Sequence, residues 1–168
     1  MSVTTVPGFI AAGVACGIKA SGADDLAMVA TADGLPVTAA GVFTSNRMTA
    51  PPVLVTREHL ATTGGRAAAV VLNSGNANAA TGASGRADAE AMCALTAGAL
   101  GCSPHEVLVC STGLIGFPLE PEFLVRRITI CLAHDAPPAR LGRTTSSPLQ
   151  FGQACPMSTL HLEQKVHS

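Results

Sequence analysis

The sequence predicts an α/β fold in which sheets and helices form packed layers, and three segments carry that prediction. Residues 26–32 alternate their apolar side chains at the spacing of a strand. Residues 67–72 are a continuous apolar run, as in a strand that is buried on both faces. Residues 86–100 repeat apolar side chains at helical spacing, and Gly101 is a natural stop. Strands that alternate with helices favour an α/β fold over an all-helical one.

Strands are expected to dominate the start of the chain. Residues 8–18 are expected to form the first strand. Asp33-Gly34 supplies a turn after the strand at residues 26–32, because glycine accepts positive φ without steric cost. Residues 37–43 continue as a further strand, so the sequence predicts a β-hairpin over residues 26–43.

The next part of the chain is expected to add a helix and a strand. Pro51-Pro52 interrupts the chain, and Thr56 is expected to cap a short helix that Gly64-Gly65 ends. A polar, glycine-rich loop is expected at residues 73–85, between the buried run and the second helix. Residues 107–110 form a short strand that is expected to leave in a turn.

Two parts of the chain differ in composition. Residues 118–168 hold six of the eleven prolines, and no apolar period that would bury a face is found beyond residue 135. We therefore divide the chain into a folded part, residues 1–119, and a divergent, proline-rich tail at residues 120–168 that is expected to be irregular.

Charge and hydropathy exclude several classes of protein. The chain of 168 residues has a formal net charge of -1, whereas a nucleic-acid partner would favour a basic face. No run of about 18 apolar residues occurs, so no membrane span is expected. The first residues lack the pattern of a secretory signal, which favours a cytoplasmic protein.

The six cysteines are interpreted as free thiols that are buried in a reducing cytosol. They show neither a C-x-x-C pair nor a zinc-ligand spacing with histidine. Phosphate-binding glycine motifs and the G-x-S-x-G elbow are also absent from the sequence, so no cofactor and no metal are predicted. His59, His105 and Lys19 are expected to be surface residues.

Two loops contain the candidate site residues. Residues 73–79 read N-S-G-N-A-N-A directly after a buried strand, which fits either a turn held by asparagine side chains or the lining of a polar site. Residues 111–116 read S-T-G-L-I-G at the end of another strand. A hydroxyl beside a glycine there could direct an O–H and a backbone N–H at one point, as an oxyanion requires, although a plain turn has the same spacing.

Several motifs in order resemble the ornithine acetyltransferase family, the glutamate N-acetyltransferases of arginine biosynthesis. The N-terminal matches are G-F-I-A-A-G-V at residues 8–14, G-I-K at 17–19, D-L-A at 25–27, A-G-V-F-T at 40–44 with Asn46, and A-P-P-V at 50–53. Residues 73–79 match the family's N-S-G-N-A-N-A signature, and residues 111–116 match its S-T-G-x-I-G signature.

The resemblance implies a layered sandwich of the self-cleaving threonine-nucleophile type. Such a precursor cuts itself before an internal threonine, whose new amine then serves as the base. The acetyl group passes from N-acetylornithine to this threonine and then to glutamate, and acetyl-CoA is a further possible donor. The two chains assemble as a heterotetramer of two α and two β chains. Thr112 and Gly113 match the oxyanion-hole pair.

The chain departs from the family pattern after residue 119. The K-G-x-G-M loop and the A-T-M-L cleavage site are missing. The cleavage-site motif is resembled by Met157-Ser158-Thr159-Leu160, which we interpret as a chance similarity. Without the nucleophile we expect this chain to be inactive by itself. The alternatives are a non-catalytic binding or assembly module derived from the family, and a related self-cleaving aminopeptidase, which should lack the N-S-G-N-A-N-A loop.

Overall fold

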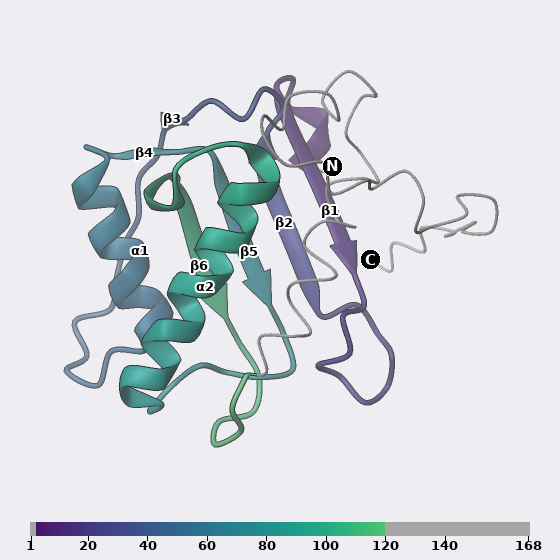
Figure 1. The fold of residues 1–168 in the computed structure, drawn as a ribbon, viewed down its shortest axis with the longest axis vertical. Coiled ribbons are helices and arrows are strands. Elements are labelled where there is room, and N and C mark those ends of the chain that lie inside the picture. The colour runs from purple at the N-terminus through teal and green to yellow at the C-terminus, as the bar shows by residue number, and fades with distance from the viewer. Residues whose placement is uncertain (1–2, 120–168) are drawn as a thin grey trace. The chain divides into compact units, whose positions relative to one another are not determined.

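The computed structural model describes residues 3–119, which form two β-sheets and two long helices (Figure 1). In chain order the elements are η1 (Val3–Thr5), β1 (Phe9–Val14), β2 (Leu26–Thr31), β3 (Val37–Thr38), α1 (Pro51–Thr62), β4 (Arg66–Ala67), β5 (Ala69–Asn73), α2 (Gly82–Leu100), η2 (Pro104–Glu106) and β6 (Val107–Ser111). The predicted α/β class is therefore confirmed. The predicted tail, with Cys131 and Cys155, lies outside the described residues.

The larger sheet has four strands in the order β1-β2-β5-β6. β2 pairs antiparallel with both β1 and β5, whereas β5 and β6 are parallel. A parallel pair needs a crossover connection, and α2 provides it. Because parallel strands end at the same edge of a sheet, the loops after β5 and β6 begin side by side, with Asn73 opposite Ser111.

The strand alternation predicted for residues 26–32 is confirmed in β2, whereas the continuous run predicted at residues 67–72 is only partly confirmed. Leu26, Met28 and Ala30 of β2 are buried, while Ala27 between them is exposed, as the alternation predicts. The apolar run predicted at residues 67–72 divides between β4 and β5. β5 is fully buried on one face and half-buried on the other, so the expectation of a strand buried on both faces is only partly met.

The predicted hairpin over residues 26–43 is wrong. Both edges of β2 are occupied, by β1 and by β5, and neither is free to pair with the segment that follows. Pro36 also lacks the N–H that a central strand would donate. Only Val37 and Thr38 form a strand, and they pair with β4.

Helix α1 begins before its predicted cap. Pro51 and Pro52 occupy its first turn, where the missing N–H groups would have no helical partner in any case. Thr56 therefore lies inside the helix. Its hydroxyl donates to the Val109 carbonyl oxygen at 2.9 Å and accepts the Val109 N–H at 3.0 Å. The helix ends as predicted before Gly64-Gly65, which both have positive φ.

His59, which was expected on the surface, is buried and only 7% exposed. Its Nδ1–H donates to the carbonyl oxygen of Val107 at 2.8 Å. β6 is an edge strand, whose outward backbone groups need partners. Thr56 and His59 provide them, so α1 closes this edge of the sheet. His105 is exposed, as expected, and its ring stands edge-on to that of His59 with 5.0 Å between centroids.

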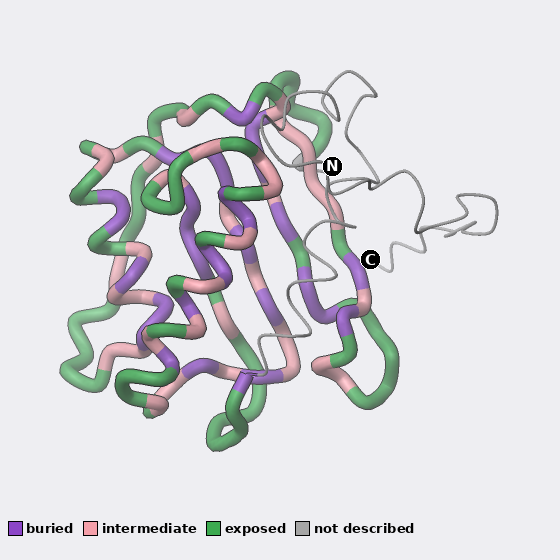
Figure 2. The backbone as a smooth tube through the Cα atoms, viewed as in Figure 1, coloured by how far each residue is buried: buried purple, intermediate pink, exposed green. Residues whose placement is uncertain are grey.

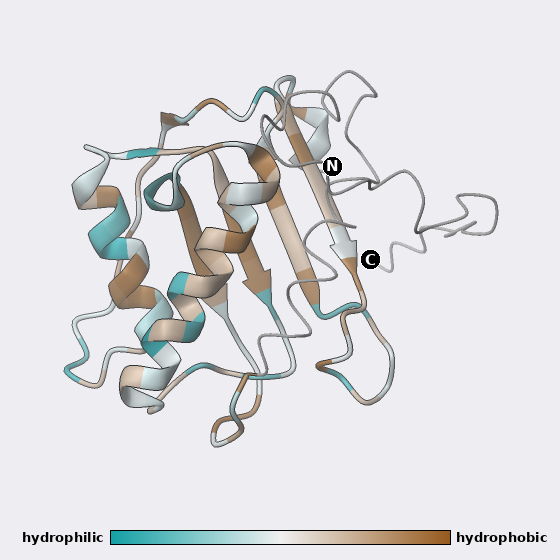
Figure 3. Ribbon diagram, viewed as in Figure 1, coloured by the Kyte–Doolittle hydropathy of each residue, from teal (hydrophilic) through white to brown (hydrophobic). Residues whose placement is uncertain are grey.

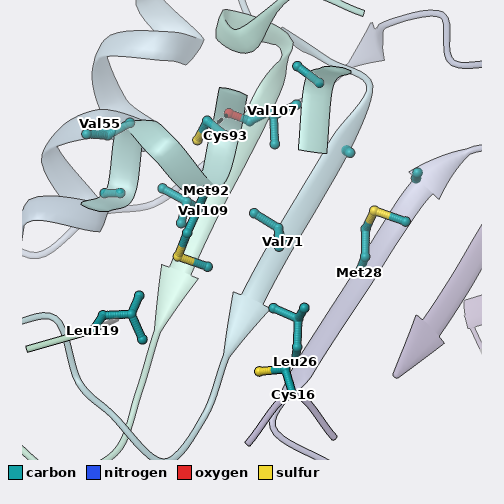
Figure 4. Close-up of a cluster of buried hydrophobic side chains, with 14 of the residues drawn as sticks. Cys16, Leu26, Met28, Val55, Val71, Met92, Cys93, Val107, Val109 and Leu119 are labelled. Atoms are coloured by element: carbon teal, nitrogen blue, oxygen red, sulfur yellow. Dashed lines mark hydrogen bonds between the residues drawn. The ribbon is translucent and has the colours of Figure 1, made fainter. Parts of the chain in front are cut away.

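Helix α2 packs its buried side chains on the sheet. It begins at Gly82, before the predicted residue 86, and ends as predicted at Gly101, whose φ of 76° is left-handed. Met92 and Cys93 lie in the core against Val71, Val107 and Val109 of the sheet (Figure 4). Figure 3 shows that the strands are more uniformly hydrophobic than the helices.

The cysteines that the structure describes are all free thiols. Cys16 and Cys93 are buried, which confirms the prediction for these two. Cys102 is half-buried, and Cys110 is exposed because it lies on the sheet face that α2 does not cover. The expectation that all the thiols are buried is therefore wrong for Cys110. Among the described helices, none is long and apolar enough to cross a membrane.

The sheet face opposite α2 is incompletely covered within residues 3–119. In β2, the buried segments alternate with more exposed ones (Figure 2). On the opposite face, Ala27, Leu72 and Cys110 are neighbours in register across three strands, and each is exposed or half-buried. Leu60 and Phe43 cover only the part of this face near Leu108.

Candidate functional site

The site is built from the loops that leave β5 and β6, here called the asparagine loop (residues 73–79) and the serine loop (residues 111–116). Backbone hydrogen bonds join them. The N–H of Thr112 donates to the Asn73 carbonyl oxygen at 3.0 Å, and the N–H of Leu114 donates to the Gly75 carbonyl oxygen at 3.2 Å. The N–H of Ala77 donates to the Leu114 carbonyl oxygen at 2.8 Å. The structure therefore brings together the two motifs that the sequence singled out.

Side chains reinforce this contact at the backbone of Asn76. The carbonyl oxygen of Asn76 accepts the Ser111 hydroxyl at 3.0 Å and the Asn73 side-chain amide at 2.8 Å. The Ser111 hydroxyl also accepts the Asn78 N–H at 3.1 Å. One hydroxyl thus connects both loops through a donated and an accepted hydrogen bond.

The three asparagines of the asparagine loop all hold backbone carbonyls. Asn73, Asn76 and Asn78 are 2%, 6% and 3% exposed. Their side-chain amides donate to the carbonyl oxygens of Asn76 (2.8 Å), Phe117 (2.7 Å) and Gly85 (2.6 Å), respectively. In the described part of the chain, the Oδ1 atoms of Asn73 and Asn76 are buried without a partner. A donor from outside these residues would satisfy them.

Glycines allow the loops to approach closely. Gly113 has a φ of 136°, and a Cβ there would lie 2.3 Å from the carbonyl carbon of Gly75 and 2.6 Å from the nitrogen of Asn76. Gly75 has a φ of 97°, and a Cβ there would lie 2.9 Å from Cγ of Lys19 and 3.1 Å from Cγ2 of Ile18. Residues 17–19, the asparagine loop and the serine loop are therefore stacked in that order.

The loop between β1 and β2 is held by the carboxylate of Asp25, which is 2% exposed. This carboxylate accepts the backbone N–H groups of Cys16 at 2.6 Å, Gly17 at 3.2 Å and Lys19 at 2.8 Å. Burial by itself would raise the pKa of Asp25, but the hydrogen bonds from Cys16 and Lys19 outweigh it and lower that pKa. Burial, together with Asp25, raises the pKa of the Cys16 thiol to about 12.

Sequence reasoning did not assign a role to Asp25. The available signal was an acidic residue directly before an apolar strand and after a glycine-containing loop, a pattern in which the carboxylate can accept several backbone N–H groups. Lys19, which was expected at the surface, is half-buried, and its Nζ donates to the carbonyl oxygen of the exposed Asp24 at 2.8 Å.

Thr112 and Gly113 are exposed at the centre of the serine loop. The Thr112 N–H donates to the Asn73 carbonyl oxygen. The Thr112 hydroxyl and the Gly113 N–H, by contrast, have no hydrogen-bond partner among residues 3–119. An open hollow of about 300 Å³ begins at the next residue of the loop, and Thr112 and Gly113 themselves do not line it. Its lining residues are Gly17, Ile18, Gly75, Asn76, Leu114, Phe117, Pro118 and Leu119. Two adjacent free donors can stabilise a developing negative charge on an oxygen atom.

The two histidines in the described part of the chain, His59 and His105, do not line this hollow. Both border a separate depression with the ion pairs of Arg86 to Glu58 and Glu90. Within the described residues, no group of three histidine, cysteine, aspartate or glutamate side chains could hold a metal ion.

Comparison with known proteins gives consistent matches. A sequence profile of the ArgJ family matches residues 10–148. The chain is 51% identical over 125 residues to the arginine biosynthesis bifunctional protein ArgJ of Streptomyces coelicolor, covering 74% of this chain and 32% of that protein. It is 55% identical over 128 residues to the protein of the same name from Mycobacterium bovis, covering 73% and 31%. The chain thus spans about a third of the length of these relatives.

Solved structures show the same similarity. The ornithine acetyltransferase of Mycobacterium tuberculosis, crystallised with ornithine, matches with a TM-score of 0.73 and 49% identity over 78% of this chain and 69% of that one. The ArgJ protein of Bacillus halodurans matches with a TM-score of 0.71 and 37% identity over 77% and 65%.

Proposed function

Because the chain belongs to the ArgJ family, we propose that it supplies the N-terminal part of an enzyme of arginine biosynthesis. This enzyme transfers the acetyl group of N2-acetylornithine to glutamate, and acetyl-CoA can serve as a second donor. The observation that supports the proposal is the serine loop, where the Thr112 hydroxyl and the Gly113 N–H are left as neighbouring free donors directly before Leu114, a residue that lines the hollow.

The proposed reaction passes through an acetyl-threonine intermediate. A threonine at the start of the second chain, released by self-cleavage of the precursor, attacks the acetyl carbonyl while its own amine takes the hydroxyl proton. The carbonyl oxygen becomes negative in the tetrahedral intermediate, and the Thr112 hydroxyl and Gly113 N–H donate to it. Ornithine leaves with the proton, and the amine of glutamate then accepts the acetyl group by the reverse steps.

We propose that a second chain carries the nucleophile, and that two α and two β chains assemble into a heterotetramer in the cytoplasm. No cofactor besides the acetyl donor takes part. The chain by itself is therefore inactive, since the loss of a covalent nucleophile removes most of the rate enhancement.

The proposal is tested by supplying the missing part. Residues 1–119 of this chain are substituted for the corresponding region of the Streptomyces coelicolor relative, which provides the remaining length; we call this protein the complemented enzyme. We expect it to form acetylglutamate from N-acetylornithine, measured by mass spectrometry, while the chain of 168 residues forms none. Turnover by the chain alone would contradict the proposed origin of the nucleophile.

Thr112→Ala then tests the oxyanion role within the complemented enzyme. Removing one such donor lowers kcat by about a hundred- to a thousandfold. The melting temperature should change little, because the side chain of Thr112 is exposed and makes no hydrogen bond within residues 3–119. An unchanged kcat would remove Thr112 from the site and leave the serine loop as a structural turn.

A further inference from the structure

We infer that Ser111 is a positioning residue that sets the place of the Thr112 and Gly113 donors by attaching the serine loop to the backbone of Asn76. The inference rests on the proposed function of that pair. Neither Ser111 nor Asn76 is assigned a step in the reaction, and their part is to hold the loop that contains the donors.

The first step of the argument is that Asn76 fixes both ends of the serine loop. At the start of the loop, the Ser111 hydroxyl donates to the Asn76 carbonyl oxygen at 3.0 Å. Just beyond its end, the Asn76 side-chain amide donates to the Phe117 carbonyl oxygen at 2.7 Å. Thr112 and Gly113 lie between these two attachments.

The second step is that Asn76 is itself held in place. The Asn73 amide donates to the same Asn76 carbonyl oxygen at 2.8 Å, and Asn73 belongs to β5, a central strand. Asn76 is 6% exposed and so is surrounded by protein. The reference point for the serine loop, Asn76, is therefore attached to the end of β5, and groups on a packed scaffold are placed more accurately than groups on a free loop.

The third step is that the backbone of Gly113 packs directly against the backbone of Asn76. A Cβ at this position would lie 2.6 Å from the nitrogen of Asn76, so the two backbones already touch. A shift of Asn76 is therefore transmitted to the Gly113 N–H. Donors that stabilise a transition state lose most of their effect when they move by about 1 Å.

Ser111→Ala removes the hydroxyl at this point with little change in volume. The Asn78 N–H then loses its partner in a residue that is 3% exposed, and the Asn76 carbonyl oxygen keeps only the Asn73 amide. The matched control is Thr56→Val. The Thr56 hydroxyl likewise bridges an N–H and a carbonyl oxygen, those of Val109, but it does so from α1 at the edge of β6.

Amide hydrogen exchange of the full 168-residue chain gives the first measurement. For Ser111→Ala we expect exchange at the N–H groups of Thr112 and Leu114 to rise about tenfold, as the loss of one net hydrogen bond implies. For Thr56→Val the increase should instead appear at Val109. Unchanged exchange at Thr112 and Leu114 in Ser111→Ala overturns the inference.

Steady-state kinetics of the complemented enzyme give the second measurement. Misplaced donors should lower kcat by roughly ten- to a hundredfold in Ser111→Ala, with KM nearly constant. Thr56→Val should lower only the melting temperature. A Ser111→Ala variant that loses stability but keeps kcat would make Ser111 merely structural. Thr112→Ala separates the positioning role of Ser111 from the proposed oxyanion role of Thr112. If Thr112→Ala lowers kcat and Ser111→Ala does not, only the positioning role fails. If kcat is unchanged in Thr112→Ala, both roles are overturned.

Discussion

Asp25 holds the β1–β2 loop with a charge that the protein stabilises, so its protonation is linked to folding. Its carboxylate accepts three backbone N–H groups, and its folded-state pKa is lowered. A lowered folded pKa contributes stability that is fully present above the unfolded pKa, about 3.9 for aspartate, and is lost as pH falls through the folded value. The contribution of Asp25 is therefore complete at neutral pH and disappears in acid.

Asp25→Asn should accordingly lower the free energy of unfolding at pH 7 by about 1.5–3 kcal/mol, the range for hydrogen bonds to charged groups. The difference from wild type should shrink as the pH falls below about 4. Urea unfolding between pH 2 and 7 measures both effects. Asp33→Asn is the control, because the exposed Asp33 carboxylate accepts only the Leu35 N–H. A difference that persists in acid would show that the charge of Asp25 is irrelevant.

Gly113 and Gly116 separate backbone strain from close packing. Both have positive φ, 136° and 99°, but a Cβ at Gly113 would meet the backbone of Gly75, whereas one at Gly116 would meet nothing within 4 Å. Gly116→Ala should thus lose stability only through backbone strain, which costs about 1–3 kcal/mol. Gly113→Ala adds overpacking of about 1–3 kcal/mol and should melt at a lower temperature. Equal melting temperatures by circular dichroism would mean that the two loops are not in contact.

Residue roles were only partly predictable. The sequence alone could not decide whether the asparagines of residues 73–79 hold a turn or line a site, because their partners at Phe117 and Gly85 are brought near by the fold. Burial of His59 was also missed, since a histidine in an amphipathic segment carries no local sign that a strand edge lies beside it. Thr112 and Gly113 were identified through the family resemblance, and their catalytic role stays a prediction.

Among the elements, α1 has the least expected function, which is to cover the open edge of β6. Thr56→Val keeps the shape of the side chain but leaves the N–H and carbonyl groups of Val109 without their side-chain partner. Since an unsatisfied buried group costs about 1–3 kcal/mol, the free energy of unfolding should fall by that amount. Thr62→Val, at an exposed position on the same helix, should change it by less than about 0.5 kcal/mol. Equal effects in urea unfolding would argue against edge capping by Thr56.

Elements were predictable where the signal is local. The alternation in β2 and the left-handed stop of α2 at Gly101 depend on neighbours in sequence, and both were predicted correctly. The hairpin failed because strand pairing depends on which edge is free, and β5, more than 30 residues further along the chain, occupies the edge of β2. Pro51-Pro52 was interpreted as a break because the same residues suit either a loop or the first turn of a helix.

At the scale of the whole molecule, one face of the larger sheet is incompletely covered within residues 3–119. Ala27, Leu72 and Cys110 lie side by side across β2, β5 and β6, and Val29 is half-buried next to them. No element within residues 3–119 covers this part of the sheet. In the proposed enzyme, further layers contributed by the second chain would pack there.

The isolated chain should therefore associate through this face, because large exposed apolar patches favour self-association. Leu72→Lys places a charge at its centre and should shift the chain toward monomer, as measured by size-exclusion chromatography with light scattering across a range of concentrations. Leu35→Lys is the control: Leu35 is 63% exposed but lies in the turn after β2, so the same charge there should leave association unchanged. The two variants have equal net charge, so a difference between them reports position alone. A monomeric wild-type chain with a sharp, cooperative melt would show instead that residues 3–119 need no partner layer.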